Sequence, residues 1–455
     1  MSDFSTRALE MFYKLCEIPH CSYHTQDMHA FLCSSLESQG YTLAVDSAFN
    51  IYAKKGKPRI CLQGHYDMVC VGDSTKHRGV TPIQKDGFLY AKDSSLGADN
   101  GIALACMLAL KESHIELLFT NDEEVGMIGA NNLSLKIESP LLLNLDSEDI
   151  HEIVLGCAGG VDIECNIDLK SDLKPLDSLL PSYPYMYKIT SSGFLGGHSG
   201  VEIHKNKENA LSEFGFFLST IEAYIITLNG GEKRNSIPVG LEAIIACDKR
   251  LDSIFYTPNG ASFDITPLES LESSDYTKAY HKNAIVPLLC GIHSGVYAGD
   301  KQGVLSSLNL SLITQKQESL ELILMARANT QDLLKRTCER LEIILPYLNS
   351  HCSMKTSGYY APWERSIEPT HKALTLLSSL YAKHNITPHL TQIHAGLECG
   401  ILKKQILAHS HIKNFEILSI GPTIHAPHSC NERLDLKDFE IFCDILQDFV
   451  TLYKE

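Results

Sequence analysis

The sequence lacks the features that would direct a protein into a membrane or a secretory pathway. No segment approaches about 18 consecutive apolar residues, which is the length that a membrane-spanning helix requires. The first residues, MSDFSTRALEMFYKLC, contain no basic segment followed by an apolar stretch, which is the pattern of a secretion signal. We therefore expect no membrane partner and a cytoplasmic location.

Basic residues and paired cysteines are also scarce. Lysine and arginine total 39 against 55 aspartate and glutamate residues, and the formal net charge of -16 opposes binding to nucleic acid. The 15 cysteines are scattered singly, without a CxxC pair, which argues against a disulfide framework and a thiolate zinc site. We expect reduced, mostly buried thiols, and any metal ion would be bound by His, Asp and Glu.

Length and composition predict a globular protein of more than one domain. A chain of 455 residues with 44% hydrophobic content is long enough for two or more packed domains. It contains no low-complexity segment and no internal repeat.

The first 150 residues predict an α/β fold, because short apolar runs alternate with helical patterns. RICLQGHYD, IELLFTN and SPLLLNLD are typical of strands, and NGIALACMLALKES is typical of a helix. The expected sheet is mostly parallel, with helices joining its strands.

A different pattern begins near residue 185. YPYMYKITSSGFLGGHSG is strand-like and ends in a glycine-rich turn, and LSSLNLSLITQKQESLELILMARANT resembles two strands that a helix, TQDLLKRTCERLEIILPYL, would cover. After GYYAPWERS the chain returns to helix, strand and helix. We predict a discontinuous α/β domain of residues 1–184 and 362–455, interrupted by an α+β domain at residues 185–361.

Polar residues gather where the predicted strands end. HYD, NDEE and LDSED each follow an apolar run, and the carboxyl edge of an open α/β sheet is where such folds place their sites. Asp122, Glu123 and Glu124 repel one another when ionised, although such a cluster taken alone is typical of a solvated turn. We expect the three clusters to converge at one edge.

Several of these residues are candidate metal ligands. His65 and Asp67 lie two apart and lean to the same face, so Asp67 is suited to hold the second ring N–H of His65. Taken alone, this pair is more typical of a structural histidine, and Asp99 would serve equally well as a helix N-cap. Asp146 ends a leucine-rich strand, where its charge must be solvated, paired or bound to metal. GPTIHAPHSCNE adds two histidines in a proline-containing loop.

Two histidines and three or four carboxylates suit zinc-like cations rather than calcium. Three ligating carboxylates would leave about one positive charge on two divalent ions, which a bridging hydroxide would neutralise. Adjacent side chains at a strand end point in different directions, so Glu124 is able to bind metal while Glu123 acts as a base toward the water.

The ordered motifs resemble a known family. They are similar to those of the aminoacyl-histidine dipeptidases, the bacterial carnosinase-like branch (peptidase D family) of the two-zinc aminopeptidase and deacylase superfamily. The resemblance covers essentially the whole chain and rests on LQGHYDMV, LGADNGIALA, DEEVGMIGA, LNLDSED, GCAGG, GGHSGVEIH, RNSIP, HAGLECG and SIGPTIHAPHS.

The resemblance implies a dinuclear zinc site in the discontinuous domain. One zinc would be held by His65, Asp99 and Asp146, and the other by Asp99, Glu124 and His428. Asp67 would orient His65, and Glu123 would be the general base that later protonates the leaving amine.

The resemblance also assigns roles in the interrupting domain, which the family uses as a lid and for homodimers. His198 would stabilise the oxyanion, while Asn235 and Arg327 would contact the substrate and its terminal carboxylate. His198 would otherwise be a turn histidine, and Arg327 a structural ion-pair partner.

One motif departs from the family. The usual HSPDE is HSCNE here, so Cys430 and Asn431 replace Pro and Asp, and the loop lacks the rigid proline and the negative charge that the family has beside the ligand. His425 would compete with His428 as a ligand, and only the alignment of PHS favours His428.

The implied activity is hydrolysis of small peptides, with Xaa-His dipeptides as the expected substrates. A tripeptidase or an N-acyl amino acid deacylase would use the same metal residues. A non-catalytic metal-binding protein is the alternative from another class, and retention of Glu123 beside the ligands argues against it. The preference for histidine rests on the resemblance alone.

Overall fold

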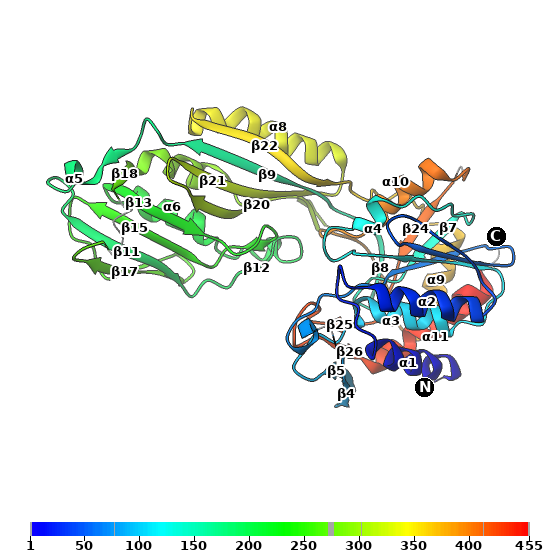
Figure 1. Ribbon diagram of the computed structural model, residues 1–455. Helices are drawn as coiled ribbons and strands as arrows, with labels where there is room; N and C mark the ends of the chain where they lie inside the picture. Colours follow the sequence, from blue (N-terminus) through cyan, green and yellow to red (C-terminus); the bar gives the residue numbers. More distant parts are fainter. Residues whose placement is uncertain (1, 77, 272–276, 302, 413, 454–455) are drawn as a thin grey trace. The chain divides into compact units, whose positions relative to one another are not determined.

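The computed structural model describes residues 2–76, 78–271, 277–301, 303–412 and 414–453. No helix among them is long and apolar enough to span a membrane. The chain forms two compact units (Figure 1). Unit 1 comprises Met1–Cys157, Trp363–Gln392 and Leu397–Glu455, and unit 2 comprises Ala158–Pro362 and Ile393–Gly396.

Unit 1 contains an eight-stranded sheet with the strand order β1-β2-β6-β3-β7-β24-β8-β23 and a small sheet with the order β25-β26-β5-β4. Its helices and strands are α1 (Asp3–Cys16), α2 (Gln26–Ser38), β1 (Thr42–Val45), β2 (Ile51–Lys55), β3 (Cys61–His65), β4 (Pro82–Lys85), β5 (Phe88–Ala91), α3 (Ala98–Ala109), β6 (Ile115–Thr120), α4 (Ile128–Asn131), β7 (Leu141–Asn144), β8 (Glu152–Cys157), α9 (Lys372–Lys383), β23 (His389–Ile393), α10 (Cys399–His409), β24 (Glu416–Ser419), β25 (Ile424–His425), β26 (Arg433–Asp435) and α11 (Leu436–Leu452).

The centre of this sheet is parallel, as predicted. Strands β6, β3, β7 and β24 are neighbours that run in the same direction, while β2 and β8 flank them antiparallel. Every residue of β3, β6 and β7 is buried, which is usual for strands covered on both faces. The carboxyl ends of four adjacent strands therefore meet at one edge.

Helix α3 lies in the core of unit 1, where it packs against α1 and β3. All its residues are buried, which explains why its sequence is apolar on every side. Gly64 permits this packing, because a Cβ there would lie 2.3 Å from Asn100 Oδ1. The start of α3 consequently lies close to the end of β3.

Unit 2 is built on a twelve-stranded sheet whose main path is β16-β17-β11-β15-β13-β20-β21-β9-β22, together with α6, α7 and α8. Its elements are β9 (Gly159–Asp168), β10 (Lys174–Pro175), α5 (Leu176–Leu179), β11 (Tyr185–Ser192), β12 (Gly197–His198), α6 (Ala210–Ser219), β13 (Ala223–Gly230), β14 (Ser236–Ile237), β15 (Leu241–Cys247), β16 (Ile254–Tyr256), β17 (Ser262–Leu268), β18 (Lys278–His281), α7 (Val286–Gly291), β19 (Gly295–Asp300), β20 (Gly303–Gln315), β21 (Ser319–Ala328), α8 (Gln331–Leu348) and β22 (Cys352–Tyr360).

The compact units differ from the expected division at the first boundary. The sequence placed that boundary after residue 184, whereas unit 2 begins at Ala158. The difference arises because β9 pairs along its length with β21 and pairs also with β22, so it belongs to the second sheet. The chain returns to unit 1 at Trp363, one residue after the expected boundary.

Candidate metal centre

The predicted ligands lie at or after the carboxyl ends of the parallel strands. His65 is the last residue of β3, Glu124 follows β6 and Asp146 follows β7. Asp99 lies at the start of α3, and His428 lies in the loop between β25 and β26. Ligand-type atoms within 4.8 Å of one another form one group of His65, Asp99 and Asp146 and a second of Asp99, Glu124 and His428. Asp99 is common to both groups.

The environment of His65 is rich in oxygen acceptors. Its Nδ1 lies 3.0 Å from the Asp67 carbonyl oxygen and must donate its proton there. Its Nε2 faces Asp99 Oδ1 at 3.1 Å and Asp146 Oδ1 at 3.4 Å. One ring nitrogen therefore faces two carboxylate oxygens, an arrangement that requires a proton or a cation at its centre.

The environment of His428 is similar. Its Nε2 lies 2.9 Å from Asp99 Oδ2 and 3.0 Å from Glu124 Oε1. A single ring N–H directed at Asp99 cannot also serve Glu124, whose buried Oε1 has no hydrogen-bond partner among the described residues. This orphaned oxygen and the mixed His and carboxylate donors fit a divalent cation.

His425, the competing ligand, belongs to neither group. It lies in β25, where its ring packs edge-on against Phe88 with 5.8 Å between the ring centroids. Cys430 is exposed and forms no disulfide. His428, rather than His425, therefore lies beside the carboxylates of Asp99 and Glu124.

Simultaneous ionisation of the carboxylates in this cluster is unfavourable, because they are buried and lie close to one another. Burial raises the pKa of Glu124 to about 7, with a further contribution from the charge of Asp99. Burial likewise raises the pKa of Asp146 to about 6. Burial opposes a charge on His428, but the adjacent carboxylates of Asp99 and Glu124 raise its pKa to about 11. Cations would relieve this repulsion by replacing the bound protons.

Asp67 supports the neighbouring acidic pair directly. Its carboxylate accepts hydrogen bonds from the backbone N–H of Glu123 at 2.9 Å and of Glu124 at 3.3 Å, and from the Ser22 hydroxyl at 2.7 Å. The nearest Asp67 carboxylate oxygen is 3.4 Å from His65 Nδ1. Asp67 thus fixes the loop that carries both glutamates in addition to lying beside His65.

Glu123 lies next to the two groups of candidate ligands, and its pKa is strongly shifted. It forms a third group of ligand-type side chains with His65 and Glu124. Burial raises its pKa well above the usual value, His65 opposes that shift, and the charges of Glu124 and Glu398 add to it. A carboxylate with a raised pKa is suited to accept a proton.

The sequence analysis assigned no role to Glu432, which holds the start of α3. Its carboxylate accepts four backbone N–H groups, from Leu96, Gly97, Ala98 and Asp99, at distances between 2.8 and 3.2 Å. This contact fixes Asp99, the residue common to both groups. The only signal for it was that Glu432 follows His428 in the quoted motif HSCNE.

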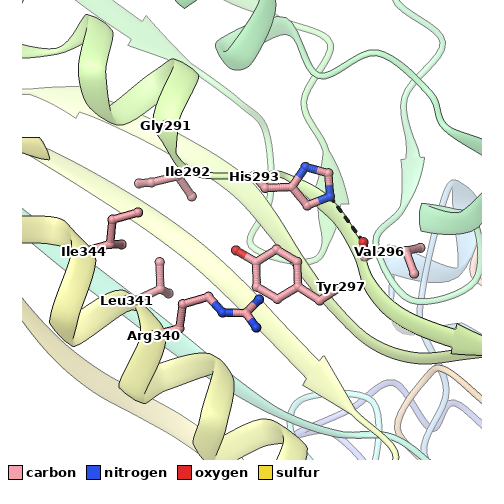
Figure 2. A pocket seen from close by; sticks show the side chains of 8 residues that line it. All are labelled: Gly291, Ile292, His293, Val296, Tyr297, Arg340, Leu341 and Ile344. Carbon is pink, nitrogen blue, oxygen red and sulfur yellow. Dashed lines mark hydrogen bonds between the residues drawn. The ribbon is translucent and has the colours of Figure 1, made fainter.

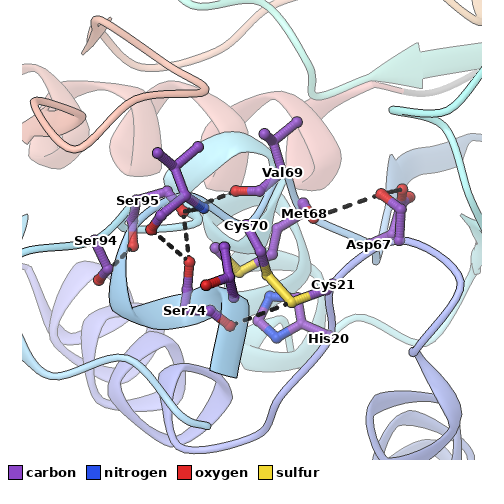
Figure 3. The surroundings of a disulfide bond; sticks show 12 residues. His20, Cys21, Asp67, Met68, Val69, Cys70, Ser74, Ser94 and Ser95 are labelled. Atoms are coloured by element: carbon purple, nitrogen blue, oxygen red, sulfur yellow. Dashed lines mark hydrogen bonds between the residues drawn. A yellow bond between two sulfur atoms is a disulfide. The ribbon is translucent and has the colours of Figure 1, made fainter. Parts of the chain in front are cut away.

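The expectation of reduced cysteines is wrong at one place. Cys21 and Cys70 form a disulfide with a Cα to Cα distance of 5.5 Å (Figure 3). The pairing arises because the backbone of residues 20–22 pairs with Met68, three residues after His65. The two cysteines are 49 residues apart in the sequence, so no local spacing indicated this contact.

In unit 2, the predicted substrate residues His198 and Asn235 lie on adjacent segments. His198 in β12 pairs with Ser236 of β14, and the Ser199 N–H donates to the Asn235 carbonyl oxygen. His198 Nδ1 accepts from the backbone N–H groups of Gly200 and Val201, each at 3.2 Å. An accepting Nδ1 leaves the ring proton on Nε2, so His198 Nε2 is a hydrogen-bond donor.

Arg327, also in unit 2, is buried and has unused donor capacity. It is 4% exposed, its Nη1 donates to the Tyr360 hydroxyl at 2.6 Å, and its Nε has no hydrogen-bond partner among the described residues.

His394 was not predicted as a site residue. It contacts Ser307 at 2.7 Å and Asn329 at 3.2 Å, and burial together with the charge of Arg327 lowers its pKa to about 3. Among the described residues, the hydrogen-bond partners of Arg327 and His394 are neutral side chains, so the guanidinium keeps its positive charge unbalanced there.

A separate cavity of about 250 Å³ lies in unit 2 between α8 and the segment from α7 to β19 (Figure 2). Tyr297 lies between His293, which stacks on its ring, and the Arg340 guanidinium, 4.8 Å from the ring centroid. None of the predicted site residues lines this cavity.

Comparison with known proteins agrees with the geometry of the cluster. The model of "Peptidase family M20/M25/M40" matches residues 61–452. The chain belongs to this peptidase family. It is therefore a hydrolase of peptide bonds, and the family match confirms the α/β fold with an inserted second domain.

Individual known proteins resemble the chain over its length. A cytosol non-specific dipeptidase of Escherichia coli (strain K12) is 29% identical, covering 99% of this chain and 98% of the relative. The crystal structure of an aminoacylhistidine dipeptidase from Vibrio alginolyticus superposes with a TM-score of 0.78 at 26% identity, covering 100% of this chain and 99% of that one. A tripeptidase from Staphylococcus aureus has a TM-score of 0.59 at 15% identity, covering 98% of both chains, which indicates a shared fold.

Proposed function

We propose that this peptidase is a dipeptidase that uses two divalent metal ions, zinc in our assignment, and cleaves Xaa-His dipeptides. The observation that carries the proposal is the pair of ligand groups joined by Asp99, each of which points one imidazole nitrogen at two carboxylate oxygens. A structural cluster of this composition would leave like charges buried without compensation.

The two groups define which residues would hold the ions. His65, Asp99 and Asp146 would bind one cation, and Asp99, Glu124 and His428 would bind the other. When bound, the cations would supply an activated water and polarise the scissile carbonyl. Glu432 would keep Asp99 in place through the four N–H groups that it accepts.

Glu123 would perform the proton transfers. Its carboxylate would take a proton from the attacking water and deliver it to the nitrogen of the leaving amine, so that the base is regenerated in each cycle. Asp67 would hold Glu123 for this task, since it accepts the Glu123 N–H at 2.9 Å. A small displacement of this loop would move the Glu123 carboxylate out of reach of the attacking water.

Unit 2 would recognise the substrate. Arg327 offers an unused N–H to the terminal carboxylate of a dipeptide, and Asn235 would contact the peptide beside it. His198 would donate from Nε2 to the oxyanion of the tetrahedral intermediate. We propose that unit 2 acts as a lid and that it forms a homodimer contact, with the protein located in the cytoplasm.

A panel of substrates tests the proposal against its alternatives. Xaa-His dipeptides, other dipeptides, tripeptides and N-acyl amino acids would be assayed at equal concentration with the Zn²⁺-loaded protein. We expect the highest kcat/KM for Xaa-His dipeptides. A preference for tripeptides or acyl amino acids would replace the proposed substrate while keeping the metal site, because those activities would use the same ligands.

Metal dependence requires its own measurement. We expect about two divalent ions per chain by elemental analysis and loss of activity after treatment with a chelator, restored by adding Zn²⁺. An active preparation without stoichiometric metal would overturn the metal proposal.

A further inference from the structure

A row of buried polar side chains crosses the parallel sheet directly beneath the metal ligands. Its members come from four neighbouring strands and from the residue that precedes α10, and all have a relative exposure of 0%. They are Thr120 of β6, Gln63 of β3, Asn144 of β7, Ser419 of β24, and Glu398. Polar side chains inside parallel strands require partners, because burial without a hydrogen bond is costly.

The hydrogen bonds of this row run in one direction and end on Glu398. The Ser419 hydroxyl donates to Asn144 Oδ1 at 2.5 Å, and Asn144 Nδ2 donates to Gln63 Oε1 at 2.6 Å. Gln63 Nε2 then donates to Glu398 Oε2 at 2.8 Å, and the Thr120 hydroxyl donates to the same oxygen at 2.6 Å. A carboxylate accepts only, so it determines which way both amides face.

The row is connected to the metal ligands by the strands themselves. Gln63 and Asn144 are cross-strand partners, and Gln63 shares a face of β3 with His65, two residues later. Asp146 lies two residues after Asn144, just beyond the end of β7. Asn144 Oδ1 also accepts the backbone N–H of Asp146 at 3.3 Å. The orientation of the Asn144 amide therefore bears on the position of Asp146.

We propose that Glu398 is a positioning residue of the metal centre: as the terminal acceptor of the row, it orients Gln63 and Asn144 and thereby holds Asp146. This inference rests on the proposed function, in which Asp146 binds a metal ion. Without an acceptor at position 398, the Gln63 amide loses its fixed direction and the Asn144 amide is free to turn its nitrogen toward Asp146.

The geometry predicts that glutamine can replace Glu398 and that alanine cannot. Both donors converge on Oε2, while the buried Oε1 has no hydrogen-bond partner among the described residues. The single carbonyl oxygen of a glutamine side chain can accept from both donors. The role of Glu398 in this row is hence that of an acceptor rather than of a charge.

Glu116 provides a matched control. It is also a glutamate with 0% exposure, but it lies four residues before Thr120 in β6, about 13 Å along the strand. Its carboxylate accepts from the Tyr52 hydroxyl and the Glu138 N–H, each at 2.8 Å, and is not part of the row. Glu116→Ala thus removes a buried carboxylate without disturbing the amides.

The experiment measures metal affinity by competition of the full-length protein with a chromophoric Zn²⁺ chelator, in wild type, Glu398→Ala, Glu398→Gln and Glu116→Ala. We expect Glu398→Ala to weaken one of the two sites by about tenfold to a hundredfold, as for the loss of other groups that orient a ligand. Glu398→Gln should remain within about threefold of wild type. Glu116→Ala should lower the melting temperature and leave both affinities unchanged.

A variant in the Glu124→Ala background identifies the weakened site, because only the group of His65, Asp99 and Asp146 is then complete. If Glu398→Ala fails to fold, Gln63→Met breaks the row while keeping the carboxylate and should weaken the same site. Unchanged zinc affinity in Glu398→Ala or Gln63→Met, or equal weakening in Glu116→Ala or Glu398→Gln, overturns the inference. In those cases two ions in the wild type would leave the proposed function standing, whereas a wild type that binds none would overturn both.

Discussion

The charged clusters of the two units differ in sign and in the way each is built. Unit 1 collects carboxylates around two imidazoles at the ends of parallel strands, where burial, and then the charge of Asp99, raises the pKa of Glu124 and Asp146. Unit 2 buries the single guanidinium of Arg327 among groups that do not neutralise it, including a His394 whose pKa is lowered. By contrast, the more exposed Arg234 of the same unit forms ion pairs with Asp162 and Glu164.

Both clusters retain a charge that the described residues do not balance, and this property identifies the ligand that each would take. An excess of buried negative charge favours cations, whereas a buried guanidinium with an unused N–H favours a carboxylate. Substitutions in the two clusters should consequently have different consequences for metal content and for substrate binding.

The largest effect is expected at the proposed base. Glu123→Gln should keep both metal ions and lower kcat by roughly two to four orders of magnitude, because the proton acceptor is lost. Metal analysis and steady-state kinetics measure the two effects separately. The control is Glu124→Ala, which should lose one ion; equal metal loss in the two variants would show that the roles of the neighbours are exchanged.

The next effect concerns the proposed oxyanion donor of unit 2. His198→Ala should lower kcat by about a hundredfold with little change in KM, because this hydrogen bond would strengthen in the transition state. Metal content should stay at the wild-type value. His204→Ala, an exposed histidine of the same unit, serves as the control and should retain activity.

Arg327 should show the opposite kinetic pattern. Arg327→Met should raise KM by about tenfold to a hundredfold with kcat less affected, since a charged hydrogen bond to the substrate carboxylate already exists in the ground state. A dipeptide amide, which lacks that carboxylate, should distinguish the variant from wild type far less. Arg234→Met tests whether loss of any arginine in this unit has the same result.

The smallest effect is the pH dependence of stability after metal removal. The folded pKa of His428, about 11, lies above the ordinary value of 6.5, and that of Glu124, about 7, lies above 4.5. The folded state therefore holds protons that the unfolded chain releases, so this contribution is present at low pH and is lost as pH rises.

The melting temperature of chelator-treated protein should fall by a few degrees between pH 5 and pH 8 because of this difference in bound protons. The Zn²⁺-loaded protein should change less over the same range, since metal ions would replace those protons. A chelated protein that becomes more stable toward pH 8 would contradict the assigned pKa directions. Asp99, whose pKa is lowered by its histidine partners despite burial, would act in the opposite direction only at more acidic pH.

The sequence was sufficient to predict the parallel strands and the convergence of polar residues at their ends. Buried apolar runs followed by HYD, NDEE and LDSED carry both signals locally. The first domain boundary was misplaced because nothing in the sequence of β9 indicates which sheet it joins. Strand pairing between distant segments has no local pattern.

The supporting residues were missed for the same physical reason. Glu432 contacts the Asp99 N–H across 333 positions, and Glu398 contacts Gln63 across 335 positions. The Cys21 and Cys70 pair likewise depends on two segments that meet only in the folded chain. A glutamate that organises a site has the same sequence signature as a surface glutamate until its burial is known.

The late position of Glu432 and His428 has a consequence for how the enzyme is made. Synthesis proceeds from the N-terminus, so Asp99 leaves the ribosome long before the residues that hold it and share its proposed metal ion. Strand β24, which lies between β7 and β8, also comes from this late segment. A nascent chain therefore cannot complete the proposed centre until the segment that carries β24, His428 and Glu432 has been synthesised.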